Sequence, residues 1–262
     1  MNLDLTGKRA IVCGSTQGIG KASAIELASL GANVTLLSRD KVKLKSALKE
    51  LPVVKPKQAH SSLVADFNSP DTLQATIEKY ANGKTIHILV NNTGGPPAGP
   101  AIDARPEEFL RAFSNHLLCN QILVQTLTPG MKKAGDGRII NIISTSVKIP
   151  IRGLGVSNTI RGAVANWAKT LSIELASFGI TVNNVLPGAT MTGRLESILK
   201  TKAEKSKKSI EEATQEMIAE IPAGRIADPS EVAAAVAFLA TPAAGYINGI
   251  NVPVDGGRTG SL

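Results

Sequence analysis

Short runs of aliphatic residues alternate along this chain with longer segments whose apolar residues recur at helical spacing. Most of the short runs consist of Val, Ile and Leu without polar alternation, which is typical of parallel strands covered on both faces. The predicted strands are 9–13, 33–38, 60–65, 86–90, 138–143, 180–186 and 250–254. The predicted helices between them are 18–30, 41–50, 70–81, 107–132, 153–177 and 229–240. This alternation predicts an α/β fold, with a doubly wound, seven-stranded parallel sheet and helices on both faces.

Two segments interrupt the alternation. Residues 94–100 are rich in Gly and Pro and predict a stiff loop after the fourth strand. Residues 190–222 predict a charged helical insertion that forms a lid over the substrate. Because ligands bind beyond the carboxyl ends of parallel strands, we expect both segments to border a site. No linker or internal repeat divides the chain, so residues 1–262 are predicted to form a single domain.

The first predicted strand is followed by glycines at positions 14, 18 and 20 and then by a helical pattern. In such a turn, main-chain N–H groups can approach a phosphate, and the helix N-terminus adds about half a positive charge. The turn therefore predicts a dinucleotide site, and a turn that binds nothing is the alternative. The candidate pyrophosphate-binding residues are Gly14, Ser15, Gln17, Gly18, Ile19 and Gly20.

Polar residues follow the second and third strands. An acidic residue after the second strand would accept hydrogen bonds from a ribose diol, whereas Arg39, which stands there, would pair with a 2′-phosphate. Arg39 therefore predicts NADP(H) as the preferred cofactor, with NAD(H) as the second choice, unless it is a solvated loop residue. After the third strand, Asp66 and Phe67 are expected to meet the amine and the face of the adenine, with a loop cap by Asp66 as the alternative.

The composition limits the partners of the protein. Hydrophobic residues make up 43 % of the chain and aromatic residues only 3 %, so we expect an aliphatic core. The formal charge is +8, but the basic residues are scattered and no nucleic-acid motif accompanies them, so no nucleic-acid partner is predicted. One basic cluster predicts either a solvated helix face or contact with an anionic ligand. It consists of Lys200, Lys202, Lys205, Lys207 and Lys208.

The sequence also bears on the cellular compartment. The two cysteines, Cys13 and Cys119, suggest no disulfide framework. The N-terminus has no secretion-signal pattern, and no apolar run is long enough to span a membrane. We therefore expect a cytoplasmic protein without a membrane partner, and no metal site is predicted.

Further motifs follow the glycine turn in order. They are Asn91-Asn92-Thr93-Gly94, Pro187-Gly188, Ile221-Pro222-Ala223-Gly224-Arg225-Ile226 and Asp255-Gly256-Gly257. Together these motifs resemble the short-chain dehydrogenase/reductase family over about residues 4–257, and most closely its 3-oxoacyl-carrier-protein reductases. The resemblance implies a Rossmann fold, a nicotinamide cofactor and a small-molecule carbonyl or acyl-thioester substrate. It also implies a homotetramer in which the helices 107–132 and 153–177 pack across a two-fold axis.

The resemblance extends to further cofactor residues and to the catalytic positions. It implies that Asn92, Thr93 and Gly94 border the adenosine side of the cofactor. The residues that would cover the nicotinamide and its phosphates are Pro187, Gly188, Thr190 and Thr192. The reaction of the family needs an asparagine, a serine, a tyrosine and a lysine four residues after the tyrosine. The corresponding residues here are His116 (with Asn115 beside it), Ser144, Ser157 and Arg161.

These departures change the expected chemistry. A phenol, whose pKa is about 10, can protonate an alkoxide, whereas a serine hydroxyl is a far weaker acid. Arg161 is permanently charged at neutral pH, so it would hold the nicotinamide ribose and polarise a hydroxyl or a water without passing a proton. The two tyrosines, Tyr80 and Tyr246, have no evident route to the nicotinamide. The standard mechanism is therefore predicted to be absent.

Three groups are candidates for the missing proton donor. His116 has a side chain whose pKa of about 6.5 suits acid–base work. Lys148 would bring an ammonium near the substrate, and a water held by Ser144, Ser157 and Arg161 is the third candidate. The sequence thus predicts an NADP(H)-dependent oxidoreductase acting on a carbonyl or alcohol, with atypical proton transfer. The alternative is a weak or inactive nicotinamide-binding sensor or partner subunit.

Overall fold

Seven parallel strands form one sheet in the computed structural model, which describes residues 1–261. The strands are β1 (Arg9–Cys13), β2 (Asn33–Ser38), β3 (Ser61–Val64), β4 (Ile88–Asn91), β5 (Gly137–Ile142), β6 (Ile180–Pro187) and β7 (Asn251–Val254). Their spatial order is β3-β2-β1-β4-β5-β6-β7, so the winding direction reverses between β1 and β4. The predicted doubly wound sheet is confirmed, and ligands bind at such a reversal in folds of this kind.

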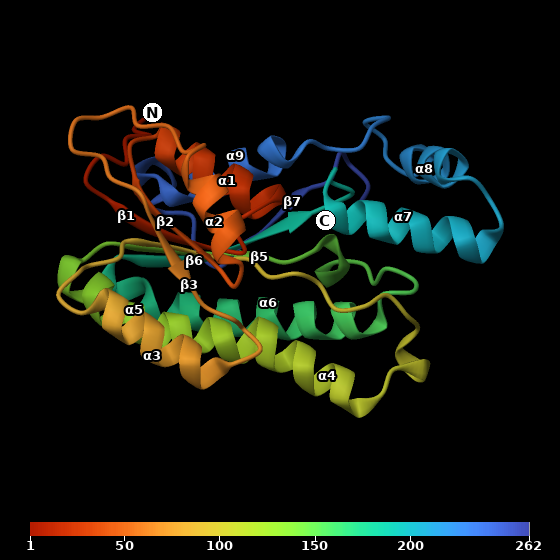
Figure 1. Cartoon of the computed structure of the whole chain (residues 1–262), viewed down its shortest axis with the longest axis horizontal. Coiled ribbons are helices and arrows are strands. Elements are labelled where there is room, and N and C mark those ends of the chain that lie inside the picture. The colour runs from red at the N-terminus through yellow and green to blue at the C-terminus, as the bar shows by residue number, and fades with distance from the viewer. Residues whose placement is uncertain (262) are drawn as a thin grey trace.

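Helices cover both faces of the sheet (Figure 1). One face carries α1 (Gly18–Ser29), α2 (Lys41–Leu48) and α9 (Pro229–Ala240). The other carries α3 (Pro70–Ala81), α4 (Pro106–Phe113), α5 (Cys119–Ala134) and α6 (Gly155–Leu175). The segment 107–132, predicted as one helix, is α4 and α5 joined by a π-helical turn at Ser114–Leu118. Such turns are frequent at functional sites, and this one carries His116.

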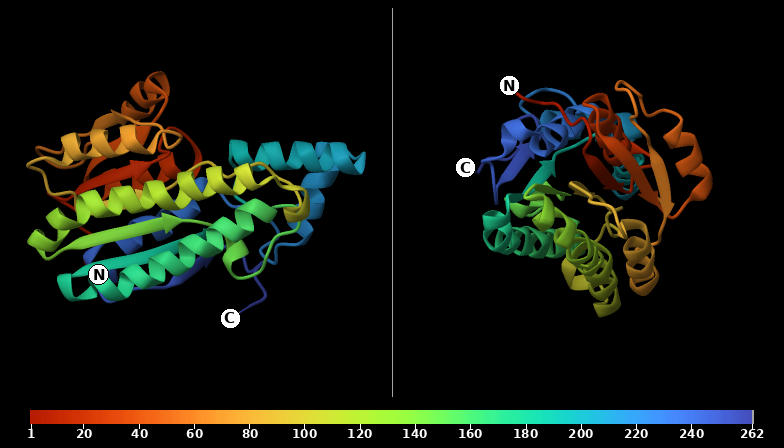
Figure 2. Two further views of the ribbon diagram at one scale, coloured as in Figure 1. Left: turned by 90° about the horizontal axis from the view of Figure 1, so that it is seen from below. Right: turned by 90° about the vertical axis from the view of Figure 1, so that its left-hand side faces the viewer.

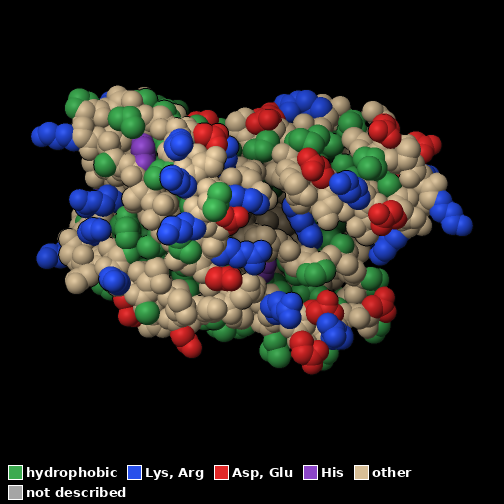
Figure 3. Space-filling model, in the orientation of Figure 1, with side chains coloured by type: hydrophobic (Ala, Val, Ile, Leu, Met, Phe, Trp, Pro, Cys, Tyr) green, Lys and Arg blue, Asp and Glu red, His purple; other side chains and the backbone are tan. Residues whose placement is uncertain are grey.

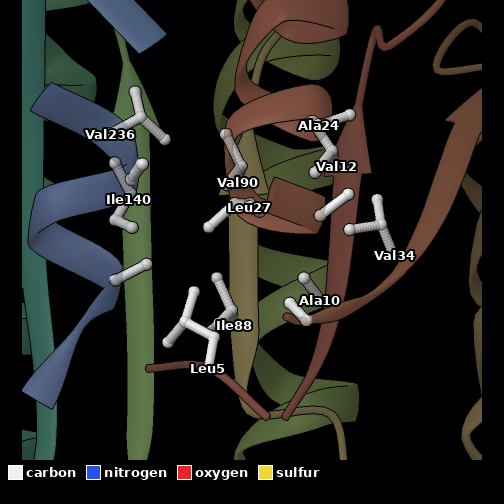
Figure 4. Close-up of a cluster of buried hydrophobic side chains, with 14 of the residues drawn as sticks. Leu5, Ala10, Val12, Ala24, Leu27, Val34, Ile88, Val90, Ile140 and Val236 are labelled. Carbon is white, nitrogen blue, oxygen red and sulfur yellow. The ribbon is translucent and has the colours of Figure 1, made fainter. Parts of the chain in front are cut away.

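The core consists of two aliphatic layers, one on each face of the sheet. In β1, Ala10 and Val12 face α1 and α9, whereas Ile11 and Cys13 face α3 and α5. Figure 4 shows part of the first layer, where Leu27 of α1 lies against side chains from the sheet. Because both faces of each central strand are buried, the strands read as continuous apolar runs.

The predicted insertion after β6 is helical. It forms α7 (Gly193–Ser206) and α8 (Ile210–Ala219), which extend away from the sheet beyond the carboxyl end of β6 (Figures 1 and 2). Thr192 caps α7 by accepting a hydrogen bond from the N–H of Leu195, and Ser209 caps α8. The two helices enclose a small hydrophobic cluster of their own: Leu195, Leu199, Ala203, Ala213 and Met217. Among residues 1–261, no helix combines the length and apolarity that crossing a bilayer requires.

A ladder of asparagine side chains crosses four neighbouring strands, from the carboxyl end of β4 through β5 and β6 to the first residue of β7. Asn91 donates to Asn141 over 2.8 Å, Asn141 donates to Asn184 over 2.9 Å, and Asn184 donates to Asn251 over 2.8 Å. Each pair is also in register across neighbouring strands. Because buried amides are costly unless they are paired, the ladder penalises any shift in strand register.

The ladder makes a prediction for stability. Asn141→Leu removes both hydrogen bonds of the central amide and leaves Asn91 and Asn184 each with an unpaired buried group. We expect the free energy of unfolding in urea to fall by ~2–5 kcal/mol. The matched control is Asn166→Leu on the exposed side of α6, which should change it by less than ~0.5 kcal/mol. Equal losses in the two variants would contradict a structural role for the ladder.

Candidate active site

A cleft of about 1290 Å³ opens at the carboxyl ends of the strands, around the reversal between β1 and β4. Figure 3 shows a hollow on this face, with Lys and Arg side chains around it. Most of the residues predicted to bind a cofactor line the cleft. They are Gly14, Gln17, Gly18, Ile19, Arg39, Asp66, Phe67, Asn92, Thr93, Gly94, Pro187, Gly188, Thr190 and Thr192. Three of the four predicted catalytic residues line it as well: Ser144, Ser157 and Arg161.

The glycine turn after β1 depends on close backbone approaches. A Cβ on Gly20 would lie 2.3 Å from the carbonyl oxygen of Gly14, and Gly14 itself has a φ of +58°. The amide of Asn92 donates to the carbonyl oxygens of Cys13 and Gly14, over 3.3 and 3.2 Å. Only glycine fits these two positions, because a side chain would push β1, α1 and the end of β4 apart.

Two residues predicted to contact the pyrophosphate lie outside the cleft lining. Ser15 is fully buried, and its hydroxyl accepts a hydrogen bond from the N–H of Leu37 over 3.0 Å. Gly20 is buried in the first turn of α1 against Gly14. The geometry gives both residues a role in shaping the turn, since neither faces the space where a ligand would lie.

The first turn of α1 can receive an anion. Its N-cap residue, Gln17, makes no capping hydrogen bond with its side chain, and the first turn holds no acidic residue. Main-chain N–H groups at the start of the helix therefore lack a side-chain acceptor. A phosphate bound there would satisfy them and benefit from the helix dipole.

On the β1 side of the reversal, residues that follow β2 and β3 line the cleft. Arg39 is exposed at its edge. One carboxylate oxygen of Asp66 accepts hydrogen bonds from the main-chain N–H and the side chain of Asn68, each over 3.0 Å. Asp66 therefore caps its own loop, which was the alternative interpretation, and its second oxygen is not part of that cap.

Ser144, Ser157 and Arg161 come together from the end of β5 and from α6. The hydroxyl of Ser144 accepts a hydrogen bond from the N–H of Ser146 over 3.1 Å, so its own proton can point elsewhere. Ser157 and Arg161 are four residues apart and therefore share one face of α6. Their exposed fractions are only 9 % and 8 %.

The guanidinium of Arg161 remains charged although it is buried. It donates to the carbonyl oxygens of Ile142 and Thr93, over 3.2 and 3.5 Å. Burial, and then the charge of Arg194, lower the pKa of Arg161 to about 10. The group is thus a positive charge at neutral pH, held at the closed end of the cleft.

His116 does not fit the role of proton donor. Its imidazole is 2 % exposed, shares a hydrogen bond with the hydroxyl of Thr93 and lies outside the cleft lining. Burial, and then the charge of Arg161, lower its pKa to about 2. The ring is therefore neutral at physiological pH, and an imidazolium is not available to protonate a substrate.

The other candidate donors also lie outside the cleft lining. The hydroxyl of Tyr80 forms hydrogen bonds with Thr35 and Ser61 beneath β2 and β3. Tyr246 is fully exposed, and Lys148 does not line the cleft. Residues 1–261 also contain no group of three His, Cys, Asp or Glu side chains that could hold a metal ion. A water beside Ser144, Ser157 and Arg161 stays a candidate, since all three side chains line the cleft.

Several residues that line the cleft had no signal in the sequence. Arg194 lies in the first turn of α7 and donates to the carbonyl oxygen of Pro96 over 2.5 Å, although 98 positions separate the two residues. Arg258 and Thr259 reach the cleft from the C-terminal segment. No short motif surrounds these residues. The sequence indicated Arg194 only indirectly, because residues 190–222 were expected to border the site.

Comparisons with known proteins agree with this fold and this cleft. A family model described as enoyl-(acyl carrier protein) reductase matches residues 14–259. A tropinone reductase homologue of Arabidopsis thaliana is 34 % identical over 258 residues, which cover 97 % of this chain and 91 % of the relative. The parallel sheet with helices on both faces is of the Rossmann type, and its cleft lies where folds of this class bind ligands. Within that class, the chain belongs to the short-chain dehydrogenase/reductase family.

Solved structures extend the comparison. L-sorbose reductase from Gluconobacter frateurii, solved with NADPH and L-sorbose, matches with a TM-score of 0.91 and 28 % identity over 100 % of both chains. A gluconate 5-dehydrogenase from Burkholderia cenocepacia, solved with NADP and tartrate, matches with a TM-score of 0.87 and 27 % identity. That match covers 100 % of this chain and 98 % of the dehydrogenase.

The lowered pKa of His116 makes a prediction for stability against pH. Below about pH 6.5 the unfolded chain takes up a proton on this imidazole, whereas the folded chain does not until about pH 2. The free energy of unfolding therefore falls by up to ~1.4 kcal/mol for each pH unit below about pH 6.5. His116→Gln should remove this loss, so urea unfolding from about pH 7 to about pH 5 should give a flatter profile than the wild type. If the free energy of unfolding depended on pH in the same way in the wild type and in His116→Gln, the ring would be protonated in the folded state over this pH range.

Proposed function

We propose that the protein is an NADP(H)-dependent oxidoreductase that transfers a hydride between the nicotinamide and a carbonyl or alcohol group, with a proton donor other than tyrosine. The observation that carries this proposal is the continuity of the cleft. One cleft is lined by the glycine turn, by Arg39 and by Ser144, Ser157 and Arg161. Support also comes from relatives whose structures contain NADPH or NADP.

In this proposal the cofactor is held mainly by main-chain groups. The first turn of α1, with Gly18 and Ile19, takes the pyrophosphate, and Arg39 takes the 2′-phosphate. Asp66 and Phe67 lie at the adenine. The residues on the remaining sides of the cofactor are Asn92, Thr93, Gly94, Pro187, Gly188, Thr190 and Thr192. The pair α7 and α8, which begins directly after Thr192, acts as the lid.

The bound cofactor supplies the hydride, and the residues at the closed end of the cleft handle the charge and the proton. Ser144 donates a hydrogen bond from its hydroxyl to the substrate oxygen, since that hydroxyl already accepts one from the N–H of Ser146. The positive charge of Arg161, which is buried beside the cleft, stabilises the negative charge that develops on this oxygen. Ser157, one turn away, orients the water that delivers the proton. In this arrangement all three side chains have a role, and the acid is the water and not a serine or an arginine.

A second candidate function is a nicotinamide-binding sensor or a partner subunit without turnover. The sequence motifs favour it, because their spacing assigns Ser157 and Arg161 to the positions where the family's reaction uses tyrosine and lysine. Binding alone would need only the glycine turn and its neighbours. Turnover assays separate the two functions.

We also propose a homotetramer that is cytoplasmic and takes a small molecule rather than a nucleic acid or a membrane as its partner. Support for the assembly comes from exposed apolar residues on α4, on the π-helical turn and on α6. They are Leu110, Phe113, Leu118 and Ile173. A surface of this kind is typical of an interface between subunits. A close relation to 3-oxoacyl-carrier-protein reductases stays a prediction from the sequence motifs.

The cofactor preference can be tested at Arg39. Arg39→Asp removes the cation and adds a carboxylate that accepts hydrogen bonds from a ribose diol. We expect the ratio of NADPH to NADH affinity, measured by fluorescence titration, to fall by at least ~10-fold. Lys45→Asp, on the exposed side of α2, changes the net charge equally and should leave the ratio unchanged. If the ratio of NADPH to NADH affinity were unchanged in Arg39→Asp, this side chain would not contact the 2′-phosphate.

Turnover can be tested at the closed end of the cleft. With NADPH and a panel of ketones and acyl thioesters, Ser144→Ala should lower kcat by ~10²–10³-fold because one donor to the developing oxyanion is lost. Ser29→Ala, on the exposed side of α1, is the matched control. The double variant Ser157→Tyr/Arg161→Lys should raise kcat, since it restores a phenol beside an ammonium. NADPH binding without turnover of any substrate by the wild type would instead favour the sensor.

A further inference from the structure

Two arginines in the cleft have no acidic partner. Arg161 of α6 is more than nine-tenths buried, and Arg194 of α7 is half-buried. Among residues 1–261, neither forms a salt bridge with an aspartate or glutamate, whereas Arg225 and Arg258 each pair with a glutamate. A buried charge without a counter-charge is costly, so this pair requires an explanation.

Both guanidinium groups are fixed against the same loop. Arg161 donates to the carbonyl oxygen of Thr93 over 3.5 Å, and Arg194 donates to that of Pro96 over 2.5 Å. Between them, a Cβ placed on Gly95 would lie 3.5 Å from Nε of Arg194. That distance is an ordinary van der Waals contact, so the guanidinium of Arg194 lies directly beside the loop at Gly95. The two cations reach the cleft from different helices and converge on residues 93–96.

The two groups retain most of their hydrogen-bonding capacity. A guanidinium carries five N–H donors, of which Arg161 uses two and Arg194 uses one in bonds to main-chain oxygens. Their charges also repel each other, since Arg194 contributes to the lowered pKa of Arg161. A bound anion would neutralise this repulsion and accept the remaining N–H groups. Arginine pairs favour planar carboxylates, which they bind in a bidentate manner.

The position of Arg161 separates it from the phosphates of the cofactor. In the proposed function the pyrophosphate lies at the first turn of α1 and the 2′-phosphate lies at Arg39. Arg161 is instead one helical turn from Ser157 and bonds to Ile142, two residues before Ser144. Apolar side chains complete this end of the cleft: Ile143, Ile149, Ile151, Leu154 and Ile198. The site thus combines two cations with an apolar wall next to the reacting position.

We propose that the substrate is a small oxo acid whose carboxylate is bound by Arg161 and Arg194 while its ketone faces Ser144. This inference rests on the proposed function. The hydride adds to the ketone carbon, the electron pair of the C=O bond moves to oxygen, and a proton from water completes the hydroxyl group. The products are a hydroxy acid and NADP⁺, and the carboxylate is unchanged. The lid helix α7 is part of this site, because it supplies Arg194.

The test compares each acid with its neutral ester. NADPH oxidation is measured for pyruvate, acetoacetate and levulinate and for their methyl esters, with the wild type, Arg194→Gln and Arg194→Lys. The control is Arg111→Gln, an exposed arginine of α4 that carries the same charge change. We expect the wild type to prefer at least one acid over its ester, and Arg194→Gln to lower kcat/KM for that acid by at least ~10-fold. The ester should be unaffected, Arg194→Lys should keep part of the preference, and the Kd for NADPH should stay within about two-fold.

Three results would overturn the inference. They are equal rates for acids and esters in the wild type, an unchanged preference in Arg194→Gln, and a parallel loss of NADPH affinity that assigns Arg194 to the cofactor. If no compound is reduced, the thermal stability of the NADPH complex is measured with each acid. Stabilisation that disappears in Arg194→Gln would uphold the carboxylate site while the reductase function fails. No stabilisation by any of the three acids would reject the carboxylate site too.

Discussion

The site exists because the chain after β1 turns within a space too small for side chains. A Cβ on Gly20 would lie 2.3 Å from the carbonyl oxygen of Gly14, and the amide of Asn92 holds that same oxygen. These contacts tie the end of β1 to the end of β4, where the winding of the sheet reverses. They also aim the N-terminus of α1 at the cleft, with no side chain of Gln17 capping its N–H groups. A phosphate is the group that such an open helix end favours.

The asparagine ladder extends this constraint to the catalytic half of the cleft. The hydrogen bonds from Asn91 to Asn251 fix the register of four strands within a few residues of their carboxyl ends. Ser144 follows β5 and Gly188 follows β6, so a one-residue shift in register would displace the residues proposed to hold the substrate and the nicotinamide. Stability and function therefore depend on the same polar groups, which is why a buried amide ladder occurs in an otherwise aliphatic sheet.

The sequence predicted the fold well because the determining signals are local. The apolar runs predicted the strands. The glycine spacing predicted the turn after β1 and most of the residues of that turn that line the cleft. Three features could not be predicted because they depend on tertiary packing. The π-helical turn at Ser114–Leu118 divides a helix of continuous helical periodicity. Burial of His116 lowers its pKa to about 2, which its residue type does not reveal. Arg194 reaches the loop at Pro96 across 98 positions without any motif around it.

The most direct test of this account is a crystal structure of the complex with NADPH. The account predicts the pyrophosphate on the main-chain N–H groups at Gly18 and Ile19, and the reactive face of the nicotinamide beside Ser144. Arg161 should face the substrate space beside Ser144. Density for the dinucleotide elsewhere on the protein, or a nicotinamide turned away from Ser144, would contradict the central claim.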